Sequence, residues 1–577
     1  MDTGSTSRSR GRASASASSS PHGRTRAIHA RRIRLVRAWL TAVALAAGSA
    51  WAMAADAVPL ALANAPGSLI VDRAGPLTLS FTTALPPDSG DATVTVELRD
   101  RDRDGTPGGT PVATYRAKAQ PALRIEVELP HPGWFAADAR LIRAGVTVAE
   151  RRFGVAAAAP VADLDAGLPD AGVATHFGQH RGDPEIVMPL IRRAGFRWFR
   201  DEIYWDNVER EPGQFVFPGD YDRYVGTAAR IGLKPLIVLD YGNAVAYPGL
   251  FTGAQGFPRT VEERALFARY AAKVAQRYAK TVGHWEVWNE PSIGPVSIDD
   301  YAALLTSVSA ALKRQDPAAQ VLACSGGGAG GGPGGDCVAS LLKRVPRGVF
   351  DGVSIHPYMT PFDPDAGYPT TPSAPISAVN IPTVWPHLRD MVARESAGRA
   401  ARPSVWVTEI GWPSSAKSTR MTDATQAAYL LRSYLLSRRY PAVAAMFWYD
   451  FVDDGTDPAD GEKNFGLLSA DLAPKPAYVA ASVLARTLGA RAWNRSLADA
   501  GGVRVYQYGT GGDAVIAGWR TGATAPATRI AVPPGKYWLR DWQGVTRALV
   551  VPDGGLAWAL GPMPQYLIPA VDGRTAP

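Results

Sequence analysis

Two short stretches of the sequence place a glutamate at the end of a hydrophobic run. Residues 284–291 read His-Trp-Glu-Val-Trp-Asn-Glu-Pro and carry Glu290, and residues 405–412 read Val-Trp-Val-Thr-Glu-Ile-Gly-Trp and carry Glu409. Hydrolysis of a glycosidic bond uses two carboxyl groups that flank the bond to be cleaved. A single glutamate after a hydrophobic strand is more often an ordinary solvated strand end. The pair, if the fold brings it together, predicts glycosidase chemistry.

The elements that must position this pair alternate in type from about residue 171 to residue 488. Hydrophobic strand-like segments alternate with amphipathic segments such as 261–278, 298–314 and 424–438, which have apolar residues at helical spacing. This alternation is typical of a parallel α/β fold, and eight such units predict a (β/α)8 barrel. A doubly wound sheet is the alternative, but no dinucleotide-binding fingerprint follows the first strand. The predicted strands span residues 173–177, 198–201, 235–240, 284–289, 321–325, 352–356, 405–409 and 445–449.

Both glutamates fall where such a barrel carries its chemistry. Catalytic side chains lie at the C-terminal ends of the barrel strands, and Glu290 and Glu409 end the fourth and seventh predicted strands. The distance between the carboxyl groups decides the stereochemical outcome. A separation of roughly 5–5.5 Å retains the anomeric configuration and one of roughly 6.5–9.5 Å inverts it. From the residues alone both outcomes stay open.

The two motifs together resemble a known family. Trp-Asn-Glu-Pro on the fourth strand with Thr-Glu-Ile-Gly-Trp on the seventh resembles the retaining glycoside hydrolases of clan A. More narrowly, the sequence is similar to glycoside hydrolase family 39, including its branch that acts on bacterial exopolysaccharides. The resemblance covers about residues 171–488. It implies a retaining mechanism with Glu290 as the general acid/base and Glu409 as the nucleophile.

The resemblance also implies roles for residues on other strands. It matches Asn289 to the residue that binds the sugar 2-hydroxyl and Arg200 to the arginine that pairs with the nucleophile. His356 and Tyr358 match a polar pair near the nucleophile, although each is about as well explained by backbone partners. Trp448 matches an aromatic side chain that stacks on a sugar. Possible subsite residues, for which core packing is at least as good an interpretation, are Trp205, Tyr241, Trp412 and Asp450.

Segments on both sides of the barrel have a β pattern. We expect a signal segment over residues 1–54, an N-terminal β-sandwich over 56–157, the barrel over 165–488 and a C-terminal β domain over 489–577. Both flanking regions alternate apolar with polar residues between Gly, Pro and Asp turns. The C-terminal domain is interpreted either as a carbohydrate-binding module or, preferably, as a domain that braces the barrel.

The positive charge of the chain belongs to its N-terminal segment. Residues 1–54 hold nine of the 61 Lys and Arg residues and one of the 53 acidic residues, which leaves 52 of each in the remainder. Nucleic acid is therefore not an expected partner. Basic residues 31–37, an apolar run over 38–47 and Ala52-Met53-Ala54 predict a cleaved export signal. The expected location is the periplasm or the medium, with an uncleaved membrane anchor as the alternative.

The two cysteines of the chain flank a glycine-rich stretch. Cys324 and Cys337 enclose nine residues of Gly or Ala among twelve that also include Ser, Pro and Asp. An exported protein favours a disulfide here over two free thiols. The stretch is not a phosphate loop, because no Gly-Lys-Ser/Thr follows it. No metal or cofactor is expected, and no Gly-x-Ser-x-Gly elbow indicates a serine nucleophile.

The expected substrate is a polysaccharide, cleaved by an endo-acting retaining glycosidase. Long segments at strand ends, residues 244–259 and 359–382, would build an extended groove for endo action, or would cap a pocket and give an exo-enzyme. The rival from another class is a non-catalytic sugar-binding or matrix-assembly protein on a barrel scaffold. Two intact carboxylates together with Asn289 and Arg200 argue against this rival.

Overall fold

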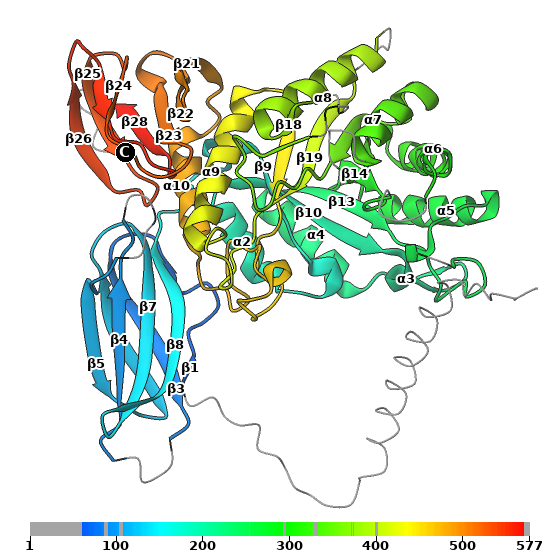
Figure 1. Ribbon diagram of the computed structural model, residues 1–577. Coiled ribbons are helices and arrows are strands. Elements are labelled where there is room, and N and C mark those ends of the chain that lie inside the picture. The colour runs from blue at the N-terminus through cyan, green and yellow to red at the C-terminus, as the bar shows by residue number, and fades with distance from the viewer. Residues whose placement is uncertain are drawn as a thin grey trace, which may run out of the picture. The chain divides into compact units, whose positions relative to one another are not determined.

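The computed structural model describes residues 60–570 apart from 86–89, 103–104, 106–107, 253, 292–295, 328–332, 371, 373, 375 and 398–401 (Figure 1). The predicted export signal at residues 1–54 lies outside these residues. From residue 60 onward the described chain forms one compact unit. Among the described residues, no helix is long and apolar enough to cross a membrane.

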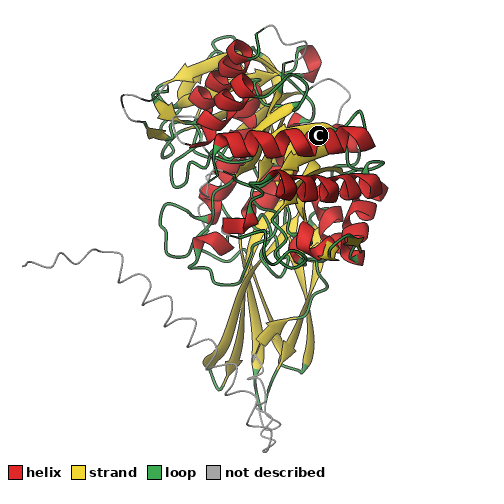
Figure 2. Cartoon of the chain, turned by 90° about the vertical axis from the view of Figure 1, so that its right-hand side faces the viewer, coloured by secondary structure: helices red, strands yellow, loops and turns green. Residues whose placement is uncertain are grey.

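A closed barrel of eight parallel strands forms the centre of the structure, which confirms the predicted fold class. Neighbouring strands follow the chain order, and the last strand closes onto the first. Helices surround the strands, as Figure 2 shows. The barrel strands are β9 (Leu168–Ala174), β10 (Phe196–Tyr204), β13 (Lys234–Asp240), β14 (His284–Val287), β15 (Gln320–Ala323), β16 (Gly352–Ile355), β19 (Ser404–Ile410) and β20 (Ala445–Trp448).

Several of the barrel helices begin at polar capping residues. Asp183 accepts a hydrogen bond from a backbone N–H at the start of the first helix, and Thr260 forms a capping box with Glu263 at the start of another. Such caps satisfy N–H groups that have no partner within the helix. The principal helices are α2 (Pro184–Arg193), α4 (Gly219–Ile231), α5 (Val261–Tyr278), α6 (Ile298–Gln315), α7 (Pro333–Arg344), α8 (Ile381–Glu395), α9 (Asp423–Arg439) and α10 (Pro476–Leu488).

The first barrel strand differs most from its prediction, which placed it at residues 173–177. Strand β9 ends at Ala174. Beyond it, the carboxylate of Asp201 accepts hydrogen bonds from the Thr175 hydroxyl and from the backbone N–H groups of Phe177 and Gly178. These bonds turn the chain away from the sheet, so the strand ends before Thr175 and a short 3-10 helix, η2 (Phe177–Gln179), follows.

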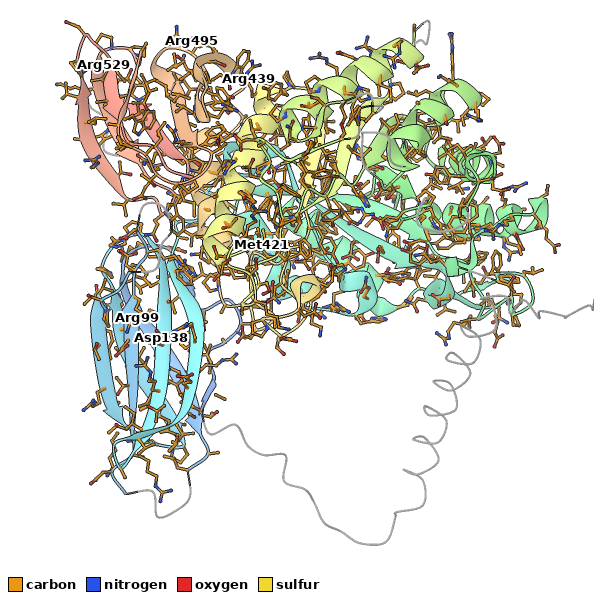
Figure 3. The ribbon with its side chains drawn as sticks, viewed as in Figure 1. Arg99, Asp138, Met421, Arg439, Arg495 and Arg529 are labelled. Atoms are coloured by element: carbon orange, nitrogen blue, oxygen red, sulfur yellow. A yellow bond between two sulfur atoms is a disulfide. The ribbon has the colours of Figure 1, made fainter. Side chains whose placement is uncertain are left out.

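The N-terminal region forms two sheets around a core of their own. One sheet contains three strands and the other contains five. Buried side chains such as Phe81, Val96 and Phe135 fill the space between them. Arg99 and Asp138, on neighbouring strands, form an ion pair with 3.2 Å between Nε and Oδ2 (Figure 3). The strands are β1 (Leu60–Leu62), β3 (Gly75–Thr83) and β6 (Ala122–Leu129), and β2 (Ile70–Val71), β8 (Val146–Ala157), β7 (Gly133–Arg143), β4 (Thr93–Arg99) and β5 (Ala113–Lys118).

The C-terminal region forms a six-stranded sheet and a two-stranded sheet. The Tyr508 hydroxyl donates to the backbone oxygen of Leu435 in α9, and Trp519 Nε1 donates to Asp365 Oδ1. These buried contacts support the bracing interpretation. The strands are β21 (Trp493–Ala500), β22 (Val503–Tyr508), β23 (Val515–Arg520), β28 (Gln565–Pro569), β25 (Gly535–Arg540) and β26 (Thr546–Val551), with β24 (Thr528–Ile530) paired to β27 (Leu556–Trp558). All-β domains therefore flank the barrel, as predicted.

Cys324 and Cys337 are joined in a disulfide, which confirms the favoured interpretation. The bond links the residue directly after β15 to helix α7. Both cysteines are buried, at 1% and 7% exposure, so the bond forms part of the barrel core and not a surface clasp.

The first strand of the barrel, β9, allows a test of how tightly the barrel interior is packed. A methyl group on Gly172 would lie 2.5 Å from Phe447 Cδ1 and 2.9 Å from Trp198 Cβ. We therefore expect Gly172→Ala to lower the free energy of unfolding by about 1–3 kcal/mol through overpacking. Gly226→Ala, on the exposed face of α4 with nothing within 4 Å, should instead raise it by up to about 1 kcal/mol. Denaturant unfolding measures both, and equal effects would contradict the packing argument.

Candidate active site

A cavity of about 560 Å³ opens at the C-terminal end of the barrel. Most of the predicted polar residues lie on its wall, namely Arg200, Tyr241, Asn289, Glu290, Tyr358 and Glu409. His356 is buried behind that wall, with its ring in contact with Glu290. The strands from which these residues come are far apart in sequence, and the closed barrel brings their C-terminal ends together.

The chain after β14 turns sharply to present Glu290. The strand ends at Val287, two residues earlier than its predicted end, and Trp288 and Glu290 have φ angles of +68° and +50°. Left-handed backbone is uncommon for residues with side chains and is found at functional sites. The backbone N–H of Glu290 donates to the backbone oxygen of Ser325 at 2.6 Å, which anchors the turn to the end of β15.

The two candidate catalytic carboxylates are close neighbours. One carboxylate oxygen of Glu290 lies within 4.8 Å of one of Glu409. The Glu290 side chain is 24% exposed and that of Glu409 is 10% exposed. Glu290 is therefore the more open to solvent, whereas Glu409 is held deep in the cavity.

Arg200, on β10, connects the residues of this wall. Its Nη1 donates to Glu409 Oε1 at 2.7 Å, its Nε to Glu286 Oε2 at 2.7 Å, and its Nη2 to Asn289 Oδ1 at 2.8 Å. The guanidinium is buried, at 4% side-chain exposure. Burial alone would lower the pKa of Arg200, but the charges of Glu286 and Glu409 raise it well above its usual value. A permanent cation thus faces Glu409.

Two further side chains bind the carboxylates from the other side. The Tyr358 hydroxyl donates to Glu409 Oε2 at 2.8 Å, and His356 Nδ1 lies 2.9 Å from Glu290 Oε1. His356 Nε2 lies 3.0 Å from Thr408 Oγ1, whose hydroxyl donates to Glu286. The Thr408 oxygen can therefore accept from His356 Nε2–H, which leaves a lone pair on Nδ1 when the ring is neutral.

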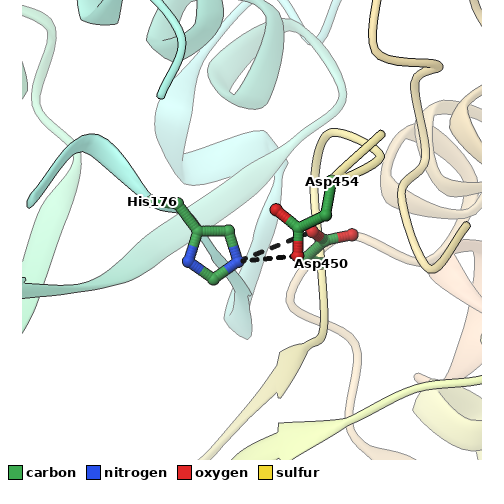
Figure 4. A group of neighbouring side chains, drawn as sticks. All are labelled: His176, Asp450 and Asp454. Carbon is green, nitrogen blue, oxygen red and sulfur yellow. Dashed lines mark ion pairs between the residues drawn. The ribbon is translucent and has the colours of Figure 1, made fainter. Parts of the chain in front are cut away.

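His176, on the cavity wall, faces two aspartates with one of its ring nitrogens (Figure 4). His176 Nε2 lies 3.6 Å from Asp450 Oδ2 and 3.7 Å from Asp454 Oδ2. At these distances the groups form ion pairs and not short hydrogen bonds. Burial would lower the pKa of His176, but the facing Asp450 and Asp454 carboxylates raise it to about 9. One ligand atom from each of these three side chains lies within 4.8 Å of the others, and a metal ion bound there would have to displace the proton of His176.

Two predicted aromatic residues do not line the cavity, and their predicted contact with sugar is wrong for this structure. Trp448 and Trp412 are both 0% exposed, and their indole N–H groups donate to the backbone oxygens of Phe465 and Phe362. Neither offers a face to a ligand because both pack into the barrel core. Trp205 is likewise buried and donates to Glu209.

Several residues of the site were missed in the sequence. They are His176, Gln179, Glu202, Tyr204, Tyr449 and Phe465, which line the cavity, and Glu286, which binds Arg200. Glu286 could have been found from the sequence, because a charged residue inside a predicted buried strand requires a partner. Tyr449 could not have been found in this way, since the hydrophobic pattern does not show whether Trp448 or Tyr449 faces the cavity.

The ion pair of His176 can be tested by NMR titration of its imidazole. We expect a pKa of about 9 and a marked fall in Asp450→Asn, because burial remains while a facing charge is lost. Since the pKa lies above the usual 6.5, the pair stabilises the fold fully below pH 6.5, and this contribution is lost as the pH rises through about 9. Asp220→Asn, which removes the partner of the exposed His180, serves as the control. A His176 pKa at or below 6.5 in the unsubstituted protein would contradict the assignment.

Comparison with known proteins identifies the family. No protein-family model matches the chain and no curated protein matches it in sequence. Among solved structures it is similar to a family 39 glycoside hydrolase from the gut symbiont Bacteroides cellulosilyticus WH2, with 34% identity over 88% of this chain and 100% of that one and a TM-score of 0.76. A monomeric β-xylosidase from Caulobacter crescentus CB15 has 18% identity over 72% of this chain and 98% of its own, with a TM-score of 0.48. The identity and coverage of the first match place this chain in glycoside hydrolase family 39.

Proposed function

We propose that this protein is a retaining glycosidase in which Glu409 is the nucleophile and Glu290 the general acid/base. The observation that carries the proposal is the separation of the two carboxylates, with oxygens within 4.8 Å of one another. A retaining site needs the shorter carboxyl separation of roughly 5–5.5 Å, whereas an inverting site leaves room for water between the groups. Membership of family 39 supports the same chemistry.

The reaction follows from the positions of these groups in two steps. In the first, a Glu409 oxygen bonds to the anomeric carbon while the glycosidic carbon–oxygen bond breaks, and the proton of Glu290 passes to the departing oxygen. In the second, Glu290 takes a proton from water, whose oxygen bonds to the anomeric carbon as Glu409 leaves. The sugar leaves with the anomeric configuration that it had in the substrate, and Glu290 is protonated again.

The surrounding residues have distinct parts in these steps. Arg200 keeps Glu409 ionised for attack, and the Tyr358 hydroxyl holds its second oxygen. The side-chain oxygen of Asn289 accepts a hydrogen bond from Arg200, and its Nδ2 donates to the Tyr241 hydroxyl at 3.0 Å. These two bonds fix the amide at the cavity wall. An amide fixed there can bind the 2-hydroxyl of the sugar, an interaction that strengthens in the transition state.

We propose a polysaccharide as the substrate, cleaved within the chain. The loop after β13 and the loop between β16 and α8 border the cavity. They supply Tyr241 and Thr360, respectively, to its wall. The second loop, between β16 and α8, contains a small hairpin of β17 (Tyr368–Pro369) and β18 (Ala378–Val379). A panel of polysaccharides, including those of the producing organism, identifies the substrate. Release of monosaccharide alone would count against cleavage within the chain.

We also propose that the protein is exported to the periplasm or the medium. The export signal predicted at residues 1–54 supports this location, and so does the buried Cys324–Cys337 disulfide, since such bonds persist in oxidising compartments. Fractionation of the producing cells with N-terminal sequencing of the mature protein tests it. A cytoplasmic protein that keeps its first residues would contradict it.

Two variants separate the roles of the carboxylates. Glu409→Gly should abolish hydrolysis, and azide should restore turnover of an activated aryl glycoside to give a glycosyl azide of inverted configuration. Glu290→Ala should lose about 10²- to 10⁴-fold toward a poor leaving group, and azide should give a product of retained configuration. NMR of the glycosyl azides makes the measurement.

Glu211→Gln is the matched control, because Glu211 is exposed on β11 (Glu209–Glu211) and does not line the cavity. It should have the activity of the unsubstituted protein. Full activity in either catalytic variant, or exchanged configurations of the two azide products, would contradict the assignment.

A further inference from the structure

We propose that the Cys324–Cys337 disulfide positions the catalytic acid, by holding the backbone of Ser325 against Glu290. The inference rests on the proposed function, since it assigns a purpose to a covalent bond outside the group of reacting residues. It predicts that the disulfide affects proton donation more than nucleophilic attack.

The turn after β15 has an unusual backbone. Cys324, Ser325 and Gly326 have φ angles of +86°, +31° and +150°. A residue with a side chain held in left-handed backbone costs about 1–3 kcal/mol and persists only where its surroundings impose it. Two such residues in succession require a strong local constraint. The disulfide at Cys324 is a covalent constraint at the first of them.

This turn is the structure to which the acid is attached. The backbone oxygen of Ser325 accepts the N–H of Glu290 at 2.6 Å. Ser325 is 0% exposed. A methyl group on Gly326 would lie 3.1 Å from Glu290 Cα and 3.3 Å from its Cγ, so the turn packs directly against the glutamate. Any displacement of residues 324–326 therefore moves Glu290.

Other contacts hold the turn, but they are single hydrogen bonds. The backbone N–H of Cys324 donates to the Tyr301 hydroxyl at 2.9 Å, and that hydroxyl donates to the backbone oxygen of Val287 at 2.9 Å. The backbone N–H of Ser325 donates to Ser354 Oγ at 3.0 Å. The disulfide adds the covalent attachment to helix α7 through Cys337.

The nucleophile is held by a separate set of contacts. Glu409 lies within β19 and binds Arg200 and Tyr358, which come from β10 and from the segment after β16. Among the described residues, the turn contacts this set directly through Ser325 Oγ, which accepts from Arg200 Nη2 at 3.4 Å. It also reaches the set indirectly through Ser354, whose hydroxyl accepts from the Ser325 N–H and donates to Glu286. Arg200 keeps its shorter bonds to Glu286, Glu409 and Asn289 when that contact is lost. Loosening the turn should thus misplace the acid and spare the nucleophile.

The test compares two aryl glycosides of the sugar that the enzyme cleaves. A 2,4-dinitrophenyl glycoside leaves without protonation, whereas a phenyl glycoside needs the acid. We expect Cys324→Ala/Cys337→Ala to cleave the phenyl glycoside roughly 10- to 100-fold more slowly, the scale expected for misplacement by about 1 Å. These rates are compared as kcat/KM, which reports the first step alone, because Glu290 also serves as the base of the second step for both substrates. The kcat/KM for the 2,4-dinitrophenyl glycoside should stay close to that of the unsubstituted enzyme. Reduction of the unsubstituted enzyme with dithiothreitol should reproduce the difference, and the double variant should not respond to it.

Gly326→Ala provides a second route that leaves the disulfide in place. Its methyl group should displace Glu290 and slow the phenyl glycoside selectively. Gly348→Ala is the matched control, because Gly348 also has a positive φ, of +82°, but nothing lies within 4 Å of the added methyl. It should leave the ratio of the two rates unchanged.

The outcomes distinguish this inference from the proposed function. If the unsubstituted protein cleaves no glycoside, the proposed function fails and the inference fails with it. If it is active but the two rates fall equally, or only the melting temperature falls, the disulfide is a structural brace and the inference alone is overturned. Should the double variant fail to fold, the reduced enzyme and Gly326→Ala decide the question by the same ratio.

Discussion

The buried guanidinium of Arg200 is the interaction on which the site depends. It joins Glu286 inside the barrel, Asn289 at the end of β14 and Glu409 on β19 through three hydrogen bonds of 2.7–2.8 Å. Two carboxylates in a dry interior carry a large desolvation cost, and a buried cation with good geometry offsets much of it. The same contacts set the position and charge of Glu409. Core and active site are therefore one network, and removal of Arg200 would leave both carboxylates without their cation.

Around this centre, each carboxylate has its own support. Glu409 is fixed from within the barrel by Arg200 and Tyr358, whereas Glu290 stands on a left-handed turn anchored to Ser325. A nucleophile must stay ionised and still, while an acid must reach the leaving group from a more open position. The exposures of 10% for Glu409 and 24% for Glu290 follow this division. His356 and Thr408 connect the acid to Glu286, so the two halves share one hydrogen-bond network.

The sequence predicted the parts of this arrangement that depend on strand order. Alternating strands and helices imply a closed barrel, and the ends of its strands must converge, so Glu290 and Glu409 were predicted to meet. The family resemblance added Arg200 to this pair. It did not predict what depends on the backbone beyond the strand ends. Trp448 packs inward while the adjacent Tyr449 lines the cavity, and His176 enters the site because Asp201 turns the chain after β9. Hydrophobic periodicity describes strands, and these turns are set by hydrogen bonds between distant residues.

The central claim is that Glu409 attacks the sugar directly. The most direct measurement is mass spectrometry of the protein after incubation with a 2-deoxy-2-fluoro glycoside of the cleaved sugar that carries an activated leaving group. The account predicts one added glycosyl unit on the intact protein, located by peptide analysis on Glu409 and absent from Glu409→Gln. Turnover of the fluoro sugar without a covalent adduct, or an adduct on Glu290, would contradict it.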